Sequence, residues 1–171
     1  SVPADAAERV WNTLLADERV KPIGLGARDS LRLEAGLPLY GHDLDETVSP
    51  IEAGLNFAVG KSRREAGDFL GAARITKELA GELSRVRVNL KVLEGAPARE
   101  GAEIADADGN VIGKVTSGGF GPSFGGAIAI GFVPPAHAVL GSQLKVIVRG
   151  KPAAAEVVAS PFVPTRYVRK L

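Results

Sequence analysis

Apolar residues recur every three to four positions in three stretches of the first half of the chain, which predicts three helices. The first helix follows Pro3 and gathers apolar side chains on one face, at Ala6, Ala7, Val10, Trp11, Leu14 and Leu15. The second helix is expected over residues 27–35, because Gly36 can end a helix and Pro38 blocks its continuation. The third helix is expected over residues 68–80.

The pattern is weaker between the second and third predicted helices. Residues 37–40 fit a short strand, and residues 55–59 form a short apolar run consistent with a buried strand. Ser49 and Pro50 fit the N-cap and first position of a short helical turn. The charged run at residues 61–65 predicts a solvated loop.

The pattern changes to strict alternation near residue 84. Apolar side chains at Val86, Val88, Leu90 and Val92 alternate with polar ones, which predicts a half-buried strand. Turn signals then separate further strands, expected at residues 103–105, 111–116, 127–133, 143–149 and 153–159, with a glycine-rich loop at 117–126. Short strands at this spacing are typical of a small barrel or sandwich. The sequence therefore predicts an α+β segment over residues 1–82, followed by an all-β unit over residues 83–171.

Composition excludes several classes of protein and site. The 171-residue chain has no cysteine, so it has no disulfide framework, zinc–thiolate site or cysteine nucleophile. Lys and Arg number 21 against 20 Asp and Glu. This balance lacks the basic excess of a nucleic-acid surface and offers no polybasic membrane anchor. No apolar run approaches the length of a spanning helix, about 18 residues. We therefore expect neither nucleic acid nor a membrane as a partner.

Two catalytic motifs are matched only superficially. Residues 121–125 fit G-x-S-x-G around Ser123, but a nucleophile elbow needs a helix after the serine, and a β-branched, alanine-rich strand follows here. The chain order Ser123, His137, Glu156 also differs from the serine, acid, histidine order of that fold. Residues 54–62 approach a phosphate loop, but five residues separate the glycines where the motif needs four. We therefore predict neither site.

The histidines and neighbouring acids do not predict a metal site. Residues 42–46 read His-Asp-Leu-Asp-Glu, a spacing that matches no known cation loop, so a solvated, turn-forming acidic loop is the preferred interpretation. His137 follows two prolines and is expected in a loop. With only two histidines in the chain, a histidine-based metal centre is not expected.

Two features have both a plain structural interpretation and a functional one. Arg28 falls near the start of the second predicted helix, where the dipole disfavours a cation. It is either a surface arginine beside Asp29 or a guanidinium held in a cleft for a carboxylate or another planar acceptor. The tail PFVPTRY, residues 161–167, has two prolines bracketing apolar residues, which predicts a docked tail. Tyr167 then either packs across the barrel or offers a ligand its ring and hydroxyl.

Long ordered motifs resemble one protein family. Residues 24–61, GLGARDSLRLEAGLPLYGHDLDETVSPIEAGLNFAVGK, resemble the signature of the aminomethyltransferases, the T-proteins of the glycine cleavage system. The resemblance covers essentially the whole chain and continues through GAPAREGAEI (95–104), GKVTSGGFGPS (113–123), AIAIGFV (127–133) and the 161–167 tail. Sarcosine and dimethylglycine oxidases and a sulfoniopropionate demethylase share this folate-dependent architecture, but the spacing and residues of the signature here are most similar to those of the T-proteins.

The resemblance implies a one-carbon transfer. The family moves an aminomethyl group from the lipoyl arm of H-protein to tetrahydrofolate, which gives methylenetetrahydrofolate and ammonia. Tetrahydrofolate is the co-substrate, it binds in a central cavity between the domains, and no metal is implied. Two folate-binding positions of the family match this chain. Arg28 matches the arginine near the pterin end, and Tyr167 matches a tyrosine of the C-terminal tail.

The resemblance also implies that this chain is the C-terminal part of a longer enzyme. Family members have a long region before the position that matches Ser1, and it carries the catalytic aspartate and a pterin-binding glutamate. We therefore assign no catalytic residue within the chain and expect the isolated chain not to be competent. Residues 1–82 are then the end of a folate-binding middle domain, residues 83–171 are a small β-barrel, and the missing N-terminal part is a partner.

Two other functions stay open on the sequence. The chain can be a folate-binding or docking module without catalysis, or the folate domain of a sarcosine or dimethylglycine oxidase, which would carry a dinucleotide-binding G-x-G-x-x-G far upstream. The usual location of family members predicts the bacterial cytoplasm, or the mitochondrial matrix if the source is a eukaryote.

Overall fold

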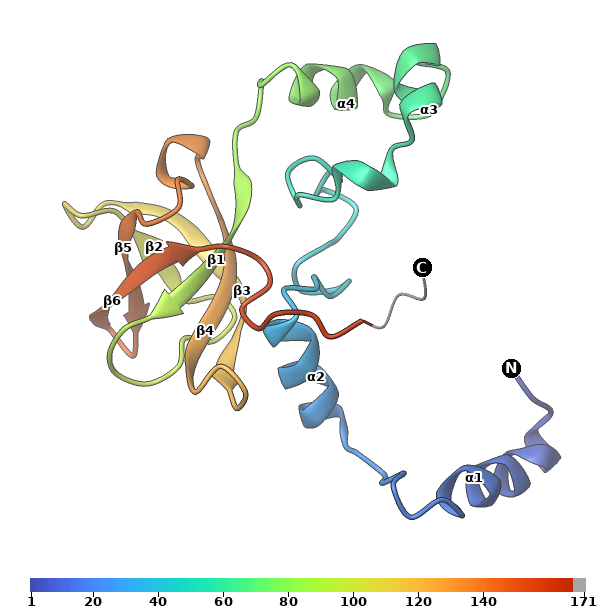
Figure 1. Ribbon diagram of the computed structural model, residues 1–171. Coiled ribbons are helices and arrows are strands. Elements are labelled where there is room, and N and C mark those ends of the chain that lie inside the picture. The colour runs from blue at the N-terminus through green and yellow to red at the C-terminus, as the bar shows by residue number, and fades with distance from the viewer. Residues whose placement is uncertain (168–171) are drawn as a thin grey trace.

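The computed structural model of the protein describes residues 1–167 of the chain. A helix-containing segment comes first, and a closed barrel of six antiparallel strands follows it. In Figure 1 the first segment passes one side of the barrel, with α1 and α4 extending away from it in different directions. The predicted fold class is therefore confirmed as a first segment that carries the helices, followed by an all-β barrel.

The helices of the first segment match the three predicted ones and include others. In chain order they are η1 (Ala4–Ala6), α1 (Ala7–Leu15), α2 (Leu25–Glu34), η2 (Asn56–Ala58), α3 (Lys61–Ala66) and α4 (Ala72–Leu79), where η marks a 3₁₀ turn. The expected third helix is α4, which begins four residues later than residue 68. The expected loop at residues 61–65 is wrong, because α3 covers these residues, although its side chains are exposed as a solvated segment requires.

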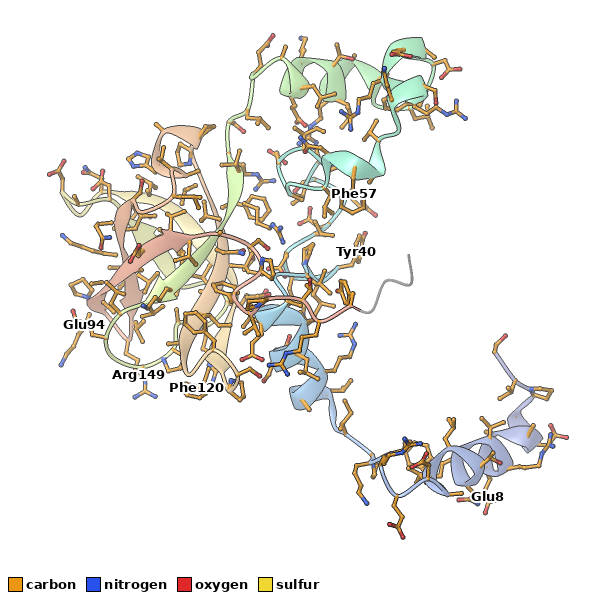
Figure 2. All side chains as sticks on the ribbon, viewed as in Figure 1. Glu8, Tyr40, Phe57, Glu94, Phe120 and Arg149 are labelled. Atoms are coloured by element: carbon orange, nitrogen blue, oxygen red, sulfur yellow. The ribbon has the colours of Figure 1, made fainter. Side chains whose placement is uncertain are left out.

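The two short strands predicted within the first segment are also wrong. Around residues 37–40 the backbone forms only an isolated bridge between Tyr40 and Leu44, and residues 55–59 contain the turn η2. Tyr40 and Phe57 are both exposed to solvent (Figure 2). A strand needs a neighbour to complete its hydrogen-bond ladder, and no described residue supplies one here. The backbone therefore satisfies its polar groups within local turns.

The end of α2 is set by Gly36, as the sequence predicts. Gly36 has a φ of +66°, the left-handed conformation that glycine adopts without steric cost. Its N–H donates to the carbonyl of Leu33, and the N–H of Leu37 donates to the carbonyl of Arg32. This pair of bonds is the Schellman motif, which satisfies the last carbonyls of a helix and turns the chain sharply.

The apolar face of α1 has no partner among residues 1–167. Trp11 and Leu14 are 54% and 58% exposed, although both lie on the apolar face that predicted the helix. Figure 1 shows α1 standing apart from the barrel. Within the same residues, no helix is long and apolar enough to cross a bilayer.

The barrel closes in the strand order β1-β4-β3-β2-β5-β6, with every adjacent pair antiparallel. Its strands are β1 (Val86–Val92), β2 (Glu103–Ala105), β3 (Val111–Gly121), β4 (Gly126–Val133), β5 (Gln143–Val148) and β6 (Lys151–Val158). The predicted glycine-rich loop at 117–126 is mostly strand, because β3 runs on to Gly121 and leaves only residues 122–125 as a turn. A 3₁₀ turn, η3 (Pro135–His137), follows β4.

The barrel core follows the alternation read from the sequence. On β1, Val88, Leu90 and Val92 are buried in the interior while Lys91 is exposed. The interior is completed by one set of buried apolar residues from the other strands and the β1–β2 connection, namely Ala98, Ile104, Val115, Ala129, Val133, Leu144, Val146, Ala153, Ala155 and Val157. Closure gives every strand of the barrel two strand neighbours, so none is an edge strand.

Strand β4 is buried on both faces, and this explains its unbroken apolar sequence. Ala129 and Val133 face the barrel interior, whereas Ile128 and Ile130 belong to a second cluster with Leu33 of α2 and Phe162 of the tail. A strand covered on both faces carries apolar residues at successive positions. The second cluster is what seats α2 against the outer wall of the barrel.

We expect Leu90→Ala to reduce the free energy of unfolding by about 2–5 kcal/mol, because it leaves a cavity in the barrel core where Leu90 is fully buried. Urea denaturation followed by circular dichroism measures the change. Lys91→Ala, on the exposed face of the same strand, is the matched control and should have little effect. Equal losses for the two variants would contradict the placement of the core.

Candidate functional site

A cavity of about 500 Å³ lies beside the first turns of α2, where the helix approaches β3 and the β1–β2 connection. We call it the α2 cavity. Its lining residues come from four segments that are far apart in sequence: Leu25, Gly26, Arg28, Asp29, Arg32, Leu39, His42, Arg99, Glu100, Thr116, Ser117 and Gly118. Small-molecule sites commonly have volumes of this order. The folding of the chain therefore brings together a ligand-sized space with several charged groups.

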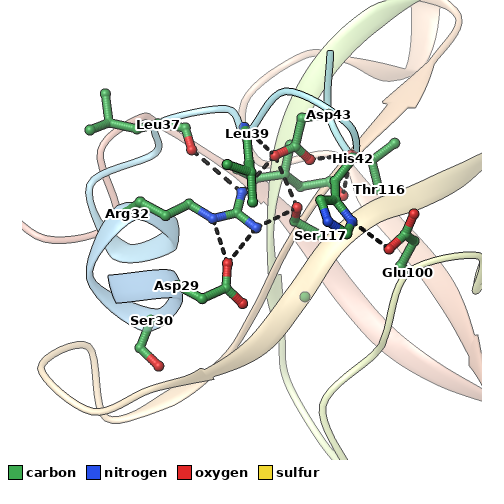
Figure 3. Close-up of polar contacts among 12 residues, drawn as sticks. Asp29, Ser30, Arg32, Leu37, Leu39, His42, Asp43, Glu100, Thr116 and Ser117 are labelled. Carbon is green, nitrogen blue, oxygen red and sulfur yellow. Dashed lines mark hydrogen bonds and ion pairs between the residues drawn. The ribbon is translucent and has the colours of Figure 1, made fainter. Parts of the chain in front are cut away.

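The centre of the site is the fully buried carboxylate of Asp43. It accepts a hydrogen bond from Arg32 Nη1 at 2.6 Å and one from the backbone N–H of Leu39 at 2.9 Å. The hydroxyls of Ser117 and Thr116 donate to it at 2.9 and 2.5 Å (Figure 3). A buried carboxylate is costly unless its charge is balanced and its lone pairs are filled, and these four donors meet both conditions.

Arg32 links α2 to this centre. Its guanidinium, 11% exposed, also binds Asp29 one helical turn away at 2.7 Å, and its Nη2 donates to Ser117 Oγ at 2.8 Å. Ser117 therefore accepts from Arg32 and donates to Asp43 (Figure 3). We call the set Arg32, Asp43, Thr116 and Ser117 the clasp, because it joins α2, the 37–44 segment and β3.

A β-bulge in β3 makes the clasp possible. The pairing register between β3 and β4 shifts between Val115 and Ser117, which leaves Thr116 as the extra residue. Adjacent side chains of a regular strand point to opposite faces, but a bulge re-aims one of them. Thr116 and Ser117 can therefore both bond the same carboxylate although they are neighbours in the chain.

Arg87 of β1 joins the same region to the end of α2. Its Nη1 donates to the carbonyl oxygen of Gly36 at 2.8 Å, where the helix leaves its last carbonyls. Burial lowers the pKa of the Arg87 guanidinium, and the negative charge of Asp43 opposes that shift. A cation is favourable at a helix C-terminus, so Arg87 reinforces the seat of α2 against the barrel.

Arg28, predicted from the sequence to be a ligand-binding residue, lines the α2 cavity. It lies in the first turn of α2, which begins at Leu25 rather than at the expected position 27. Its side chain is exposed, and within residues 1–167 it forms no ion pair. The neighbouring Asp29, which could have neutralised it, is bound by Arg32 instead.

Tyr167, the second predicted residue, is not among the residues that line the α2 cavity. The tail docks as expected: Phe162 is buried and packs edge-to-face on Phe124 at 5.9 Å between ring centroids. The N–H of Val163 also donates to the carbonyl of Glu34 at 3.2 Å. Tyr167, the last described residue, is 68% exposed. The structure therefore anchors the tail beside α2 without bringing Tyr167 into the cavity with Arg28.

Sequence reasoning missed the burial of four acids, Glu34, Asp43, Glu52 and Glu78, and the first two lie next to the α2 cavity or within α2 itself. The interpretation of residues 42–46 as a solvated acidic loop is wrong for Asp43, which is fully buried, although Asp45 and Glu46 are exposed. Glu34 is also buried, and it accepts the backbone N–H groups of Ser123 and Phe124 at 2.6 and 2.9 Å. The one sequence signal for the burial of Asp43 was the pair of leucines near it, Leu39 and Leu44, because apolar residues in a loop favour packing against the rest of the protein.

The turn that Glu34 holds is the one that contains the G-x-S-x-G match. Ser123 lies between β3 and β4, so a strand, not a helix, follows the turn. Its backbone N–H is bound to Glu34, and its side chain is exposed. The rejection of a nucleophile elbow at this position is therefore confirmed.

A larger cavity of about 710 Å³, the α4 cavity, lies between α3, α4 and the 46–60 segment. Its arginines are paired: Arg74 binds Glu52 and Glu78 at 2.9 and 2.6 Å, and Arg63 binds Asp68 at 3.1 Å. The hydrogen bond to Glu78 and the charge of Glu52 raise the pKa of the Arg74 guanidinium. The Arg74 network ties α4 to the preceding segment, and both arginines of the cavity are paired with acids.

The two histidines lie in different parts of the structure. His42 Nδ1 lies 2.7 Å from Glu100 Oε2 at the rim of the α2 cavity, and His137 ends the turn η3. No group of three or more His, Cys, Asp or Glu side chains within the described residues could hold a metal ion.

Comparison with known proteins places the chain in a family. The family model of the glycine cleavage T-protein C-terminal barrel domain matches residues 85–164, and that of the GCVT N-terminal domain matches residues 1–63. The chain belongs to the glycine cleavage T-protein family. Curated relatives of this T-protein chain include the mitochondrial aminomethyltransferase of Mus musculus, 50% identical over 167 residues, and that of Pisum sativum, 48% identical over 171 residues.

A solved structure gives the same assignment. The crystal structure of glycine cleavage system aminomethyltransferase T from Bartonella henselae matches with a TM-score of 0.93 and 47% identity, over 98% of this chain and 46% of that one. The mouse and pea relatives are likewise matched over 98% and 99% of this chain but only 41% and 42% of their own length. The chain therefore spans less than half the length of the T-protein relatives it matches.

We expect Asp43→Asn to reduce the free energy of unfolding by about 3–5 kcal/mol, because it leaves the Arg32 guanidinium without its buried counter-charge. Thermal or urea unfolding measures the loss. Asp17→Asn, which removes a solvent-exposed pair with Arg19, is the control and should change stability far less. A similar, small effect for both variants would show that the clasp does not hold α2 in place.

Proposed function

We propose that this chain contributes the C-terminal, folate-binding half of an aminomethyltransferase. In the proposed reaction, lipoylated H-protein carries an aminomethyl group, tetrahydrofolate accepts its carbon, and the products are methylenetetrahydrofolate, ammonia and dihydrolipoyl H-protein. The observation that carries the proposal is the α2 cavity, which is lined by Arg28 within the signature motif of the family. The identity of 45–50% to curated aminomethyltransferases supports it.

In this proposal Arg28 binds the pterin end of tetrahydrofolate. A guanidinium presents several N–H donors in one plane, which suits the planar, acceptor-rich edge of a pterin ring. Arg28 faces the cavity without an ion-pair partner in the described chain, so its donors are available to a ligand. The clasp keeps α2, and therefore Arg28, at a constant position relative to β3.

Tyr167 is proposed to contact the same ligand from the tail. Phe162 anchors the tail beside α2, and Tyr167 follows five residues later with its ring exposed. An exposed aromatic ring with a hydroxyl can both stack on a ligand and bond to it. This role rests on the family resemblance together with the docked tail.

The catalytic acid is proposed to lie outside this chain. The matched relatives are more than twice as long, and we propose that the region they have beyond the match supplies the catalytic aspartate. Residues 1–82 then complete a folate-binding domain, and residues 83–171 form the barrel domain.

The relatives named above are aminomethyltransferases, which does not favour the alternatives of a non-catalytic module or an oxidase domain. The mouse and pea relatives are mitochondrial aminomethyltransferases. We accordingly propose the bacterial cytoplasm, or the mitochondrial matrix in a eukaryote, for this chain.

We expect Arg28→Ala to weaken tetrahydrofolate binding by about 1.5–3 kcal/mol, the usual loss for a charge-assisted hydrogen bond. Isothermal titration of tetrahydrofolate into the whole enzyme, under reducing conditions, measures the dissociation constant. Arg9→Ala, an exposed arginine of α1 outside the cavity, should leave it unchanged. An unaltered dissociation constant for Arg28→Ala would refute the assignment.

We expect the 171-residue chain alone to form no methylenetetrahydrofolate from aminomethylated H-protein and tetrahydrofolate, because it lacks the proposed catalytic aspartate. The same chain, joined to the residues that precede the matched region in the Bartonella henselae relative, should be active. Ammonia release and methylenetetrahydrofolate formation are measured together. Turnover by the isolated chain would contradict the proposed division of roles.

A further inference from the structure

The residues that line the α2 cavity include more arginines than carboxylates. Three arginines line it, and its two carboxylates are already engaged: Asp29 is bound by Arg32, and Glu100 lies 2.7 Å from His42. Arg28 and Arg99 therefore have no carboxylate partner among residues 1–167. In the α4 cavity, by contrast, each arginine is paired with an acid.

Arg99 is held at the cavity by the backbone around it. It lies on the β1–β2 connection, directly after the fully buried Ala98. This connection packs so closely on β3 that a Cβ on Gly118 would overlap the carbonyl oxygen of Ala98. The N–H of Gly101 also donates to the carbonyl of Val115 at 2.8 Å. The position of Arg99 is therefore set by the barrel wall.

The side chain of Arg99 has one weak intramolecular contact. Its Nη1 donates to the carbonyl oxygen of Gly118 at 3.2 Å, and the residue is otherwise exposed at the rim. A guanidinium has five N–H donors in a fork that matches a carboxylate. The backbone of Arg99 is thus held in place, while most N–H donors of its guanidinium remain available at the rim of the α2 cavity.

We propose that Arg99 binds a carboxylate of the glutamate tail of tetrahydrofolate, at the solvent-exposed rim of the α2 cavity. The inference rests on the proposed folate function and extends it to the other end of the ligand. Folate is elongated, with a planar pterin at one end and an anionic glutamate at the other. Arg28 on α2 and Arg99 on the β1–β2 connection supply one guanidinium for each end, and the exposure of Arg99 lets the tail leave toward solvent.

The test compares two probes that differ only in the glutamate. Dissociation constants are measured by titration for tetrahydrofolate and for tetrahydropteroate, which lacks the glutamate. For Arg99→Gln we expect tetrahydrofolate to bind about 10- to 100-fold more weakly, the range of a lost charge-assisted hydrogen bond, while tetrahydropteroate binding is unchanged. Arg99→Lys, which keeps the charge, should recover part of the loss. Arg9→Gln is the matched arginine control away from the cavity.

Three other outcomes are decisive. Equal weakening of both probes in Arg99→Gln would mean that Arg99 shapes the cavity without binding the tail, and the inference would be overturned. Unchanged tetrahydrofolate binding in the same variant would overturn it as well. If the unaltered chain, joined to the residues that precede the matched region in the Bartonella henselae relative, binds neither probe, the proposed folate function itself fails, and this result is distinguishable from the first two.

Discussion

The buried carboxylate of Asp43 is the group on which the arrangement of the site depends. A charge without solvent around it is stable only if a counter-charge and several hydrogen-bond donors surround it. Arg32 provides the counter-charge from α2, and Thr116 and Ser117 provide hydroxyls from β3. Because the donors come from separate segments, satisfying one carboxylate fixes the position of three parts of the chain at once.

Apolar packing and the clasp have different effects on the same interface. Leu33 and Phe162 cover the outer face of β4, and this burial supplies a non-directional attraction between α2, the tail and the barrel. The clasp is directional, since each of its bonds has a preferred distance and angle. Together they define the rotation of α2, and therefore which of its side chains line the α2 cavity.

The chemistry of the cavity suits binding more than bond making. Within the described residues, Asp29 is bound by Arg32, and Glu100 lies within hydrogen-bond distance of His42. Neither carboxylate is therefore an unpaired general base. What remains available are the guanidinium donors of Arg28 and Arg99. This division agrees with our proposal for a T-protein chain that spans less than half the length of its relatives: the chain holds one side of the ligand, and another region supplies the catalytic acid.

The sequence by itself determined the three main helices, the strands of the all-β part and the Gly36 helix end, because these depend on local periodicity and backbone conformation. It also singled out Arg28, by its place in a family motif. The loss of the expected strands at 37–40 and 55–59, and the burial of Asp43, were decided by tertiary structure. A strand needs a partner, and a carboxylate can be buried only where distant residues bring donors to it. The position of Arg99 at the α2 cavity was also decided by tertiary structure. The fold brings this residue next to α2 and β3, where no carboxylate of the described residues pairs with it.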